Sequence, residues 1–166
     1  MAVKWKISPD QIAGIMGNMR WEGDFSPYNA QDSFGYPDRN NSESSAYPYV
    51  FDSIVKEVGF GLCQWSALSR KSALAAFAIK RGTGVWDMIT QLEFMKYEMS
   101  ECKEYTTYNK VWGEILSADS RSEVTRIMFD DYEECKDKSL GSRQRYADSV
   151  YKSFYSPEFF EFYNNP

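Results

Sequence analysis

The chain has 166 residues, a net charge of −5 and no histidine. An acidic chain without a basic stripe argues against nucleic acid as a partner, and no apolar run is long enough to span a bilayer. The absence of histidine argues against Ser-His-Asp and Cys-His catalysis and against zinc hydrolases with histidine ligands. We therefore expect no metal or cofactor, and a chemistry that rests on carboxylates, amides, tyrosines or water.

The first predicted element is a helix that runs from Ser8 to Glu22. Ser8 can cap it, Pro9 suits its first position, and Gln11 completes a capping-box pattern. One face carries an apolar stripe at helical spacing, made by Ile12, Ile15, Met16 and Met19. The helix is therefore predicted to pack into the core along this stripe.

The opposite face of this helix carries Gly14 and Gly17. Small residues there would let another element approach closely, so the helix is predicted to be buried on two sides. Glu22 lies at the edge of the apolar stripe, on the last turn. The helix dipole and the apolar neighbours both favour its protonated form, which a general acid in glycoside cleavage requires. The alternative is an ordinary surface glutamate beside Gly23, a glycine that ends the helix.

The segment from Ser26 to Phe60 is irregular and is punctuated by prolines. It predicts an elaborated loop or a small β-hairpin region inside a helical domain. The stretch Val58 to Trp65 then has glycines at two positions one residue apart, which indicates a tight backbone course. Gln64 offers a hydrogen-bond donor and acceptor, and Trp65 offers a flat face that can stack on a sugar. The same stretch could equally be a packed turn before the next helix.

Further helices are predicted over about Ala67–Lys80, Val85–Glu101, Tyr108–Leu116, Ser120–Tyr132 and from Ser142 onward. The second of these has Trp86, Ile89, Leu92 and Met99 as its main apolar stripe. No linker rich in glycine, serine or proline divides the chain. We predict a single domain over residues 1–166 that is mainly α, or α+β with a minor strand element.

Two stretches, Gly17–Pro27 and Gly59–Trp65, resemble the motifs of the phage tail lysozyme family. That family has a Gly-Asn-Met helix end, a catalytic Glu, an aromatic-x-Pro turn and a Gly-aromatic-Gly-Leu-x-Gln-Trp motif. More distantly, the stretches resemble lytic transglycosylases and goose-type lysozymes. Weaker matches downstream, such as Ser69-Arg70, extend the resemblance over most of the chain. One departure is Gly23, where family members often have serine.

The resemblance implies a lysozyme-like fold with a central Glu-bearing helix, and cleavage of peptidoglycan between N-acetylmuramic acid and N-acetylglucosamine. Glu22 would be the general acid. The sugar cleft would be lined by Gly61, Gln64 and Trp65, and supported from the helix behind by Tyr132 and Glu133. The resemblance also implies a place in a phage tail, with bacterial peptidoglycan and other tail proteins as partners. The N-terminal residues lack the apolar core of a signal peptide.

A second catalytic carboxylate would come from the aspartates between the two motifs, which are Asp24, Asp32, Asp38 and Asp52. Asp52 is selected because it lies closest to the second motif. A hydrolase would use such a group, whereas a lytic transglycosylase would need none, because the muramic acid 6-hydroxyl attacks intramolecularly. A hypothesis of another class is a non-catalytic peptidoglycan-binding or tail-structural module.

Overall fold

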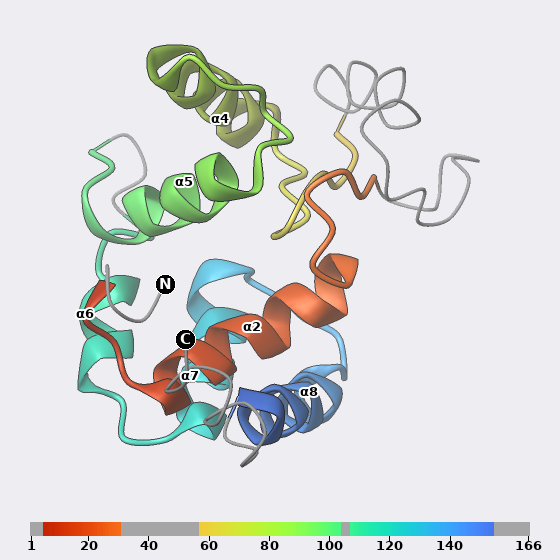
Figure 1. Ribbon diagram of the computed structural model, residues 1–166, viewed down its shortest axis with the longest axis vertical. Coiled ribbons are helices and arrows are strands. Elements are labelled where there is room, and N and C mark those ends of the chain that lie inside the picture. Colours follow the sequence, from red (N-terminus) through yellow and green to blue (C-terminus); the bar gives the residue numbers. More distant parts are fainter. Residues whose placement is uncertain (1–4, 31–56, 104–106, 155–166) are drawn as a thin grey trace, which may run out of the picture.

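A computed structural model describes residues 5–30, 57–103 and 107–154 of the chain, and this part is mainly helical (Figure 1). The elements in chain order are α2 (Pro9–Gly23), α4 (Leu68–Arg81), α5 (Met88–Ser100), α6 (Val111–Ser117), α7 (Arg121–Ile127), η2 (Met128–Tyr132) and α8 (Leu140–Phe154). In these residues the β structure is one antiparallel bridge between Ala30 and Phe60. The predicted mainly-α class is confirmed.

Helix α2 begins as its sequence predicts. The Ser8 hydroxyl accepts a hydrogen bond from the Gln11 amide at 3.2 Å, and the Gln11 side chain accepts one from the Ser8 amide at 2.8 Å. Pro9 takes the first helical position, where its missing N–H leaves no donor unsatisfied. The capping box thus sets where α2 starts.

The two glycines of α2 bring the neighbouring helices against its back. A Cβ on Gly14 would lie 2.6 Å from Cβ of Val124 in α7. A Cβ on Gly17 would lie 2.6 Å from the carbonyl oxygen of Arg143 in α8. Both distances are shorter than a carbon side chain can tolerate, so only glycine permits this approach. The prediction that α2 is buried on two sides is confirmed.

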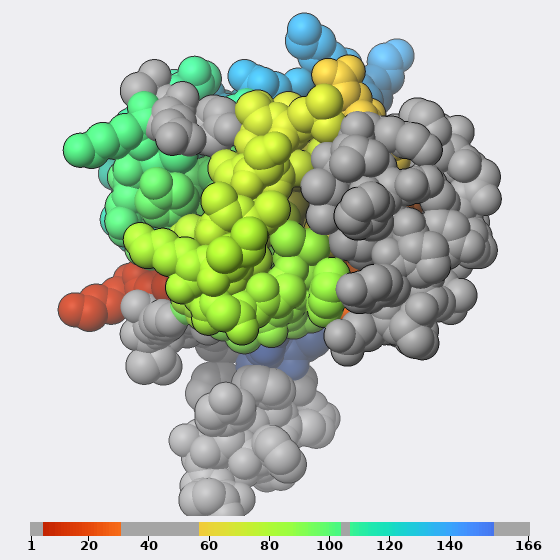
Figure 2. Space-filling view, turned by 90° about the horizontal axis from the view of Figure 1, so that it is seen from above, coloured from red at the N-terminus to blue at the C-terminus, as the bar shows by residue number. Residues whose placement is uncertain are grey.

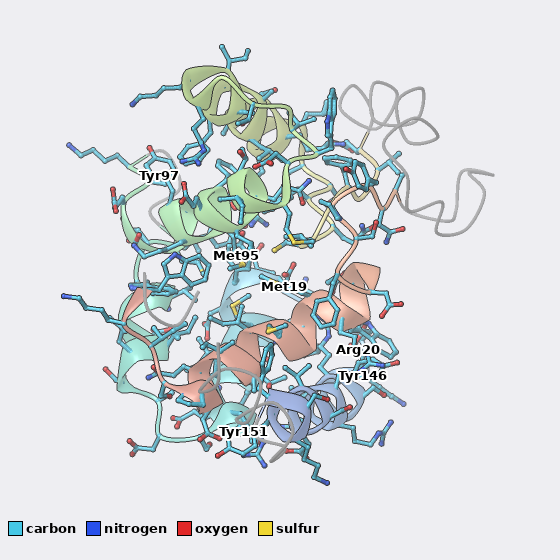
Figure 3. All side chains as sticks on the ribbon, viewed as in Figure 1. Met19, Arg20, Met95, Tyr97, Tyr146 and Tyr151 are labelled. Atoms are coloured by element: carbon cyan, nitrogen blue, oxygen red, sulfur yellow. The ribbon has the colours of Figure 1, made fainter. Side chains whose placement is uncertain are left out.

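The opposite face of α2 looks toward α5. Met19 on α2 and Met95 on α5 lie in the space between the two helices (Figure 3), and both belong to the main hydrophobic core. Helix α4 packs beyond α5, and seen from above it runs across that surface of the molecule (Figure 2). Helices α7 and α8 therefore lie on one side of α2, and α5 with α4 on the other (Figure 1).

Three helix starts and one apolar stripe differ from the prediction. Helix α6 begins at Val111 and not at Tyr108. Helix α5 begins at Met88 because the Asp87 side chain caps it, accepting from the Thr90 amide at 2.7 Å. Its buried face carries Phe94, Met95 and Met99, whereas Ile89, which was predicted to be on the stripe, is 54% exposed. Helix α8 begins at Leu140, so Ser142 lies inside it.

No helix in the described ranges is long and apolar enough to cross a membrane. Most of the predicted loop or hairpin region, Ser26 to Phe60, falls within 31–56, outside the residues that the structure describes, and so does Asp52.

Candidate active site

Helix α2 ends at Gly23, and Glu22 lies on its last turn. Asp24, not Gly23, adopts the left-handed conformation that closes the helix, with φ of 50° and its amide donating to the Arg20 carbonyl. Gly23 meets another need. A Cβ there would lie 3.0 Å from Asn29 Nδ2 and 3.3 Å from the Gly61 carbonyl oxygen, so its lack of a side chain leaves room for the second motif.

Asn29 joins the end of α2 to the second motif. Its side-chain amide donates to the Glu22 carbonyl at 3.2 Å. Its own carbonyl accepts from the Gly61 amide at 2.7 Å and from Gln64 Nε2 at 3.2 Å. Gly61 has a φ of +76°, which glycine adopts readily. The two sequence motifs thus meet beside Glu22.

Gln91 of α5 fixes three backbone segments around this junction. Its Oε1 accepts from the Leu62 amide at 2.9 Å, and its Nε2 donates to the carbonyls of Pro27 and Val85, both at 2.8 Å. Gln91 is completely buried, so these bonds satisfy backbone groups that water does not reach. A glutamine at helical spacing from the buried Phe94 and Met95 is the sequence signal for this role.

Arg143 of α8 forms an ion pair with Glu22 through Nη2 and Oε1. Its side chain is 1% exposed and that of Glu22 is 16% exposed. Nη1 donates to Asn18 Oδ1 at 3.1 Å, and Nε donates to Ser139 Oγ at 2.9 Å. The guanidinium is therefore held in one orientation by α2 and by the start of α8, and it orients the Glu22 carboxyl in turn.

Sequence reasoning missed Arg143, although a signal was present. Arg143, Ala147 and Val150 recur at the spacing of one helical face, and all three are buried. An arginine on such a face must have an acidic or polar partner in the core.

Burial raises the pKa of Glu22. The positive charge of Arg143 and its hydrogen bond act in the opposite direction, and the negative charge of Asp137 adds to the rise. The balance still favours the protonated carboxyl more than water would.

Glu133 is the first residue after η2, a π-helical turn closed by its amide, which donates to the Met128 carbonyl at 2.8 Å. Its side chain is half-buried. Burial first, and then the negative charge of Glu22, raise the pKa of Glu133 well above its usual range. The structure therefore brings the Glu133 carboxyl within electrostatic reach of Glu22.

A buried polar network lies behind the second motif. Glu98 of α5 accepts hydrogen bonds from Trp65 Nε1 at 2.9 Å and from the Tyr132 hydroxyl at 2.6 Å. Arg70 of α4 donates to both of its carboxylate oxygens, at 2.9 and 3.0 Å. Trp65 and Tyr132 are completely buried, so neither ring leaves a face on which a sugar can stack. Gly61 is buried as well, and Gln64 is half-buried.

An open cavity of about 710 Å³ begins two residues beyond Glu22. One wall is the turn Asp24–Tyr28, and the other consists of Thr83, Gly84, Trp86, Asp87 and Met88. The Gln91 bonds to Pro27 and Val85 tie the two walls together. Within the described ranges, His, Cys, Asp and Glu side chains form no group of three that could hold a metal ion.

The site thus has a half-buried glutamate at a helix end, a buried arginine that orients it, and a glycine-rich turn against its backbone. The sequence model of the family described as phage tail lysozyme matches residues 1–154. The chain matched no curated protein sequence and no solved structure in two other comparisons. The chain belongs to the phage tail lysozyme family, whose activity is lysozyme-like cleavage of peptidoglycan.

Proposed function

We propose that this protein cleaves the β-1,4 bond between N-acetylmuramic acid and N-acetylglucosamine, with Glu22 as the general acid. The observation that carries the proposal is the environment of Glu22: a half-buried carboxyl on the last turn of α2, oriented by the buried Arg143. Burial favours the protonated form, which can donate to the glycosidic oxygen.

Arg143 acts at both stages of this proton transfer. Before the transfer it orients the Glu22 carboxyl, and afterwards its charge stabilises the carboxylate that the transfer leaves behind. The open cavity that begins at Asp24 adjoins the end of α2, but Glu22 is not among the residues that line it. Half-buried Gln64 stays the proposed sugar contact, with buried Gly61, Trp65 and Tyr132 forming the wall behind it. Asp52 stays the proposed second carboxylate of a hydrolase.

We further propose that the reaction serves penetration of the bacterial wall by a phage tail, where other tail proteins would be its partners. Family membership supports this setting.

The test is a zymogram with purified peptidoglycan that compares the wild type with Glu22→Gln. The expected loss of clearing is about 10²- to 10⁴-fold, the usual contribution of a general acid. Glu101→Gln, at an exposed position just after α5, is the matched control and should clear like the wild type. Clearing that survives Glu22→Gln, or wall binding without any product, contradicts the proposal.

Analysis of the products separates the two glycan-cleaving reactions. New reducing ends identify a hydrolase, and 1,6-anhydro ends identify a lytic transglycosylase. Both reactions require Glu22 as the acid. They differ in the attacking group, which is water in the hydrolase and the muramic acid 6-hydroxyl in the lytic transglycosylase.

A further inference from the structure

Trp21 is the tryptophan that the fold leaves most open to solvent. All five tryptophans of the chain lie in the described ranges. Trp21 is 42% exposed, whereas Trp5, Trp65 and Trp112 are buried and Trp86 is half-buried. A single exposed apolar side chain is ordinary on a protein surface, so its position decides whether it has a role.

Trp21 lies directly before Glu22 on the last turn of α2, and both side chains reach the same arginine of α8. The central guanidinium carbon of Arg143 lies 5.9 Å from the centre of the Trp21 ring. Nη2 of that guanidinium binds the Glu22 carboxyl. The exposed ring therefore adjoins the group that orients the proposed acid.

The Trp21 ring is held in place before any ligand binds. The ring of Tyr146, also on α8, lies 6.3 Å from it between centroids, with 41° between the two planes. Tyr146 in turn lies under the guanidinium of Arg20, 4.7 Å from its ring centre, and the two side chains are seen together at the end of α2 (Figure 3). A ring that α8 already holds loses little conformational freedom when a ligand stacks on it.

Two charged side chains flank Trp21 along α2. Nε of Arg20 lies 3.8 Å from Oδ1 of Asp24, and these side chains are 36% and 57% exposed. Such a solvated pair still has donors and acceptors to offer a ligand. A sugar ring complements this arrangement, because its C–H bonds form an apolar face while the hydroxyls at its edge both donate and accept hydrogen bonds.

Resting on the proposed function, we infer that Trp21 stacks on one sugar ring of the glycan strand, beside the bond that Glu22 cleaves. Arg20 and Asp24 bind the hydroxyls of that sugar. Trp21 thus makes the aromatic contact that the sequence predicted for Trp65, which the fold buries against Glu98.

The Trp21 contact and the proposed Gln64 contact are reached from Glu22 through different groups. The Glu22 backbone carbonyl accepts from Asn29, whose own carbonyl accepts from Gln64 Nε2. The Glu22 carboxyl instead binds Arg143, against which Trp21 lies. One sugar contact therefore belongs to the second motif and the other to the contact of α2 with α8, so that the acid has a sugar contact from each.

The decisive experiment measures the binding of glycan strands, freed of their stem peptides, to the inactive Glu22→Gln protein by calorimetry. Adding Trp21→Ala should raise Kd about tenfold, the size of effect expected for the loss of one aromatic contact. Trp21→Phe keeps a ring and should recover part of the affinity. Ile79→Ala, which removes a 78% exposed apolar side chain from α4, is the control and should bind like its parent. Equal affinity of Trp21→Ala and its parent overturns the inference.

An NMR measurement on the protein that keeps Trp21 separates stacking from an effect on folding. The indole ¹H–¹⁵N signal of Trp21 in Glu22→Gln is identified by its loss in the variant that also carries Trp21→Phe. Glycan strands should shift this signal and leave those of the buried Trp5 and Trp112 in place. Free stem peptide should shift none of them. A Trp21 signal that glycan does not move, or that stem peptide moves, overturns the inference.

The inference and the proposed function fail in different measurements. If the wild type releases no product while glycan still shifts the Trp21 signal, the proposed function fails and the sugar contact stands. If the wild type clears peptidoglycan while Trp21→Ala has an unchanged KM on soluble glycan strands, the inference fails and the proposed function stands.

Discussion

At the scale of single residues, Arg143 explains the Gly17-Asn18 pair that precedes Glu22. Gly17 lets the α8 backbone approach α2, Asn18 accepts a hydrogen bond from Arg143, and Met19 packs in the core. Gly17 and Asn18 thus serve the contact with α8, and Met19 serves the packing toward α5. The outcome is a buried arginine that reaches the Glu22 carboxyl.

The raised pKa of Glu133 predicts an unusual dependence of stability on pH. The unfolded chain loses this proton near the ordinary value of 4.5, whereas the folded protein keeps it to higher pH. Above about pH 4.5 the folded state therefore binds more protons than the unfolded state, and this group lowers stability as pH rises. The loss ends once the pH passes the folded-state value.

Glu133→Gln removes that loss. Its free energy of unfolding should exceed that of the wild type above pH 4.5, by a gap that widens by at most about 1.4 kcal/mol per pH unit. Below pH 4.5 the titration of Glu133 should cause no difference between the free energies of unfolding of the two proteins. Urea unfolding between pH 4 and about pH 8 measures the gap, and a gap that does not open above pH 4.5, or that narrows as pH rises, would contradict the assignment.

At the scale of elements, the approach of α8 to α2 positions the ion pair. Gly17→Ala would place a methyl 2.6 Å from the Arg143 carbonyl oxygen and 2.8 Å from Ala147 Cβ. Both obstacles are tightly packed, so the helices must separate, at a cost of about 1–3 kcal/mol. Arg143 moves with α8, so clearing of peptidoglycan should also fall.

Gly113→Ala in α6 is the matched control. No atom lies within 4 Å of a Cβ at Gly113, and the residue is exposed within a helix. Alanine should stabilise the protein by about 0.5–1 kcal/mol there and leave activity unchanged. Thermal unfolding and the zymogram measure both variants; equal effects of the two substitutions would refute the packing argument.

At the scale of the whole molecule, the Glu98 network joins the two sides of the fold. It links α4 and α5 to η2 through Arg70 and Tyr132, and it holds Trp65 of the second motif. Glu98 is completely buried, so its charge has no access to water. The position of the motif against Glu22 depends on this network.

Glu98→Gln should destabilise the protein by about 3–5 kcal/mol, because it leaves the charge of Arg70 uncompensated. Replacing both partners, as Arg70→Met with Glu98→Gln, should recover much of that loss, because no unpaired charge then remains buried and the glutamine oxygen can still accept from Trp65 and Tyr132. Urea unfolding of the two single variants and the double variant measures this. Additive losses would show that the two side chains act independently.

The sequence by itself determined the mainly helical class, the capped start of α2 and the two motifs. These features depend on residues only a few positions apart, through caps, glycines and helical periodicity, which local physics decides. The prediction failed where the local pattern was ambiguous. Helix α5 has apolar side chains on more than one face, and packing against α4 and α6 decided that Ile89 stays exposed.

Only the tertiary structure decided what surrounds Glu22. Arg143 and Glu133 come from elements far along the chain, and no periodicity within either element identifies its partner. Trp65 was expected to face a sugar, yet the fold buries it because its indole N–H has a carboxylate partner in Glu98. A buried charge or indole is stable only beside a complementary group, and that group is supplied by the packing of distant helices, not by the neighbouring sequence.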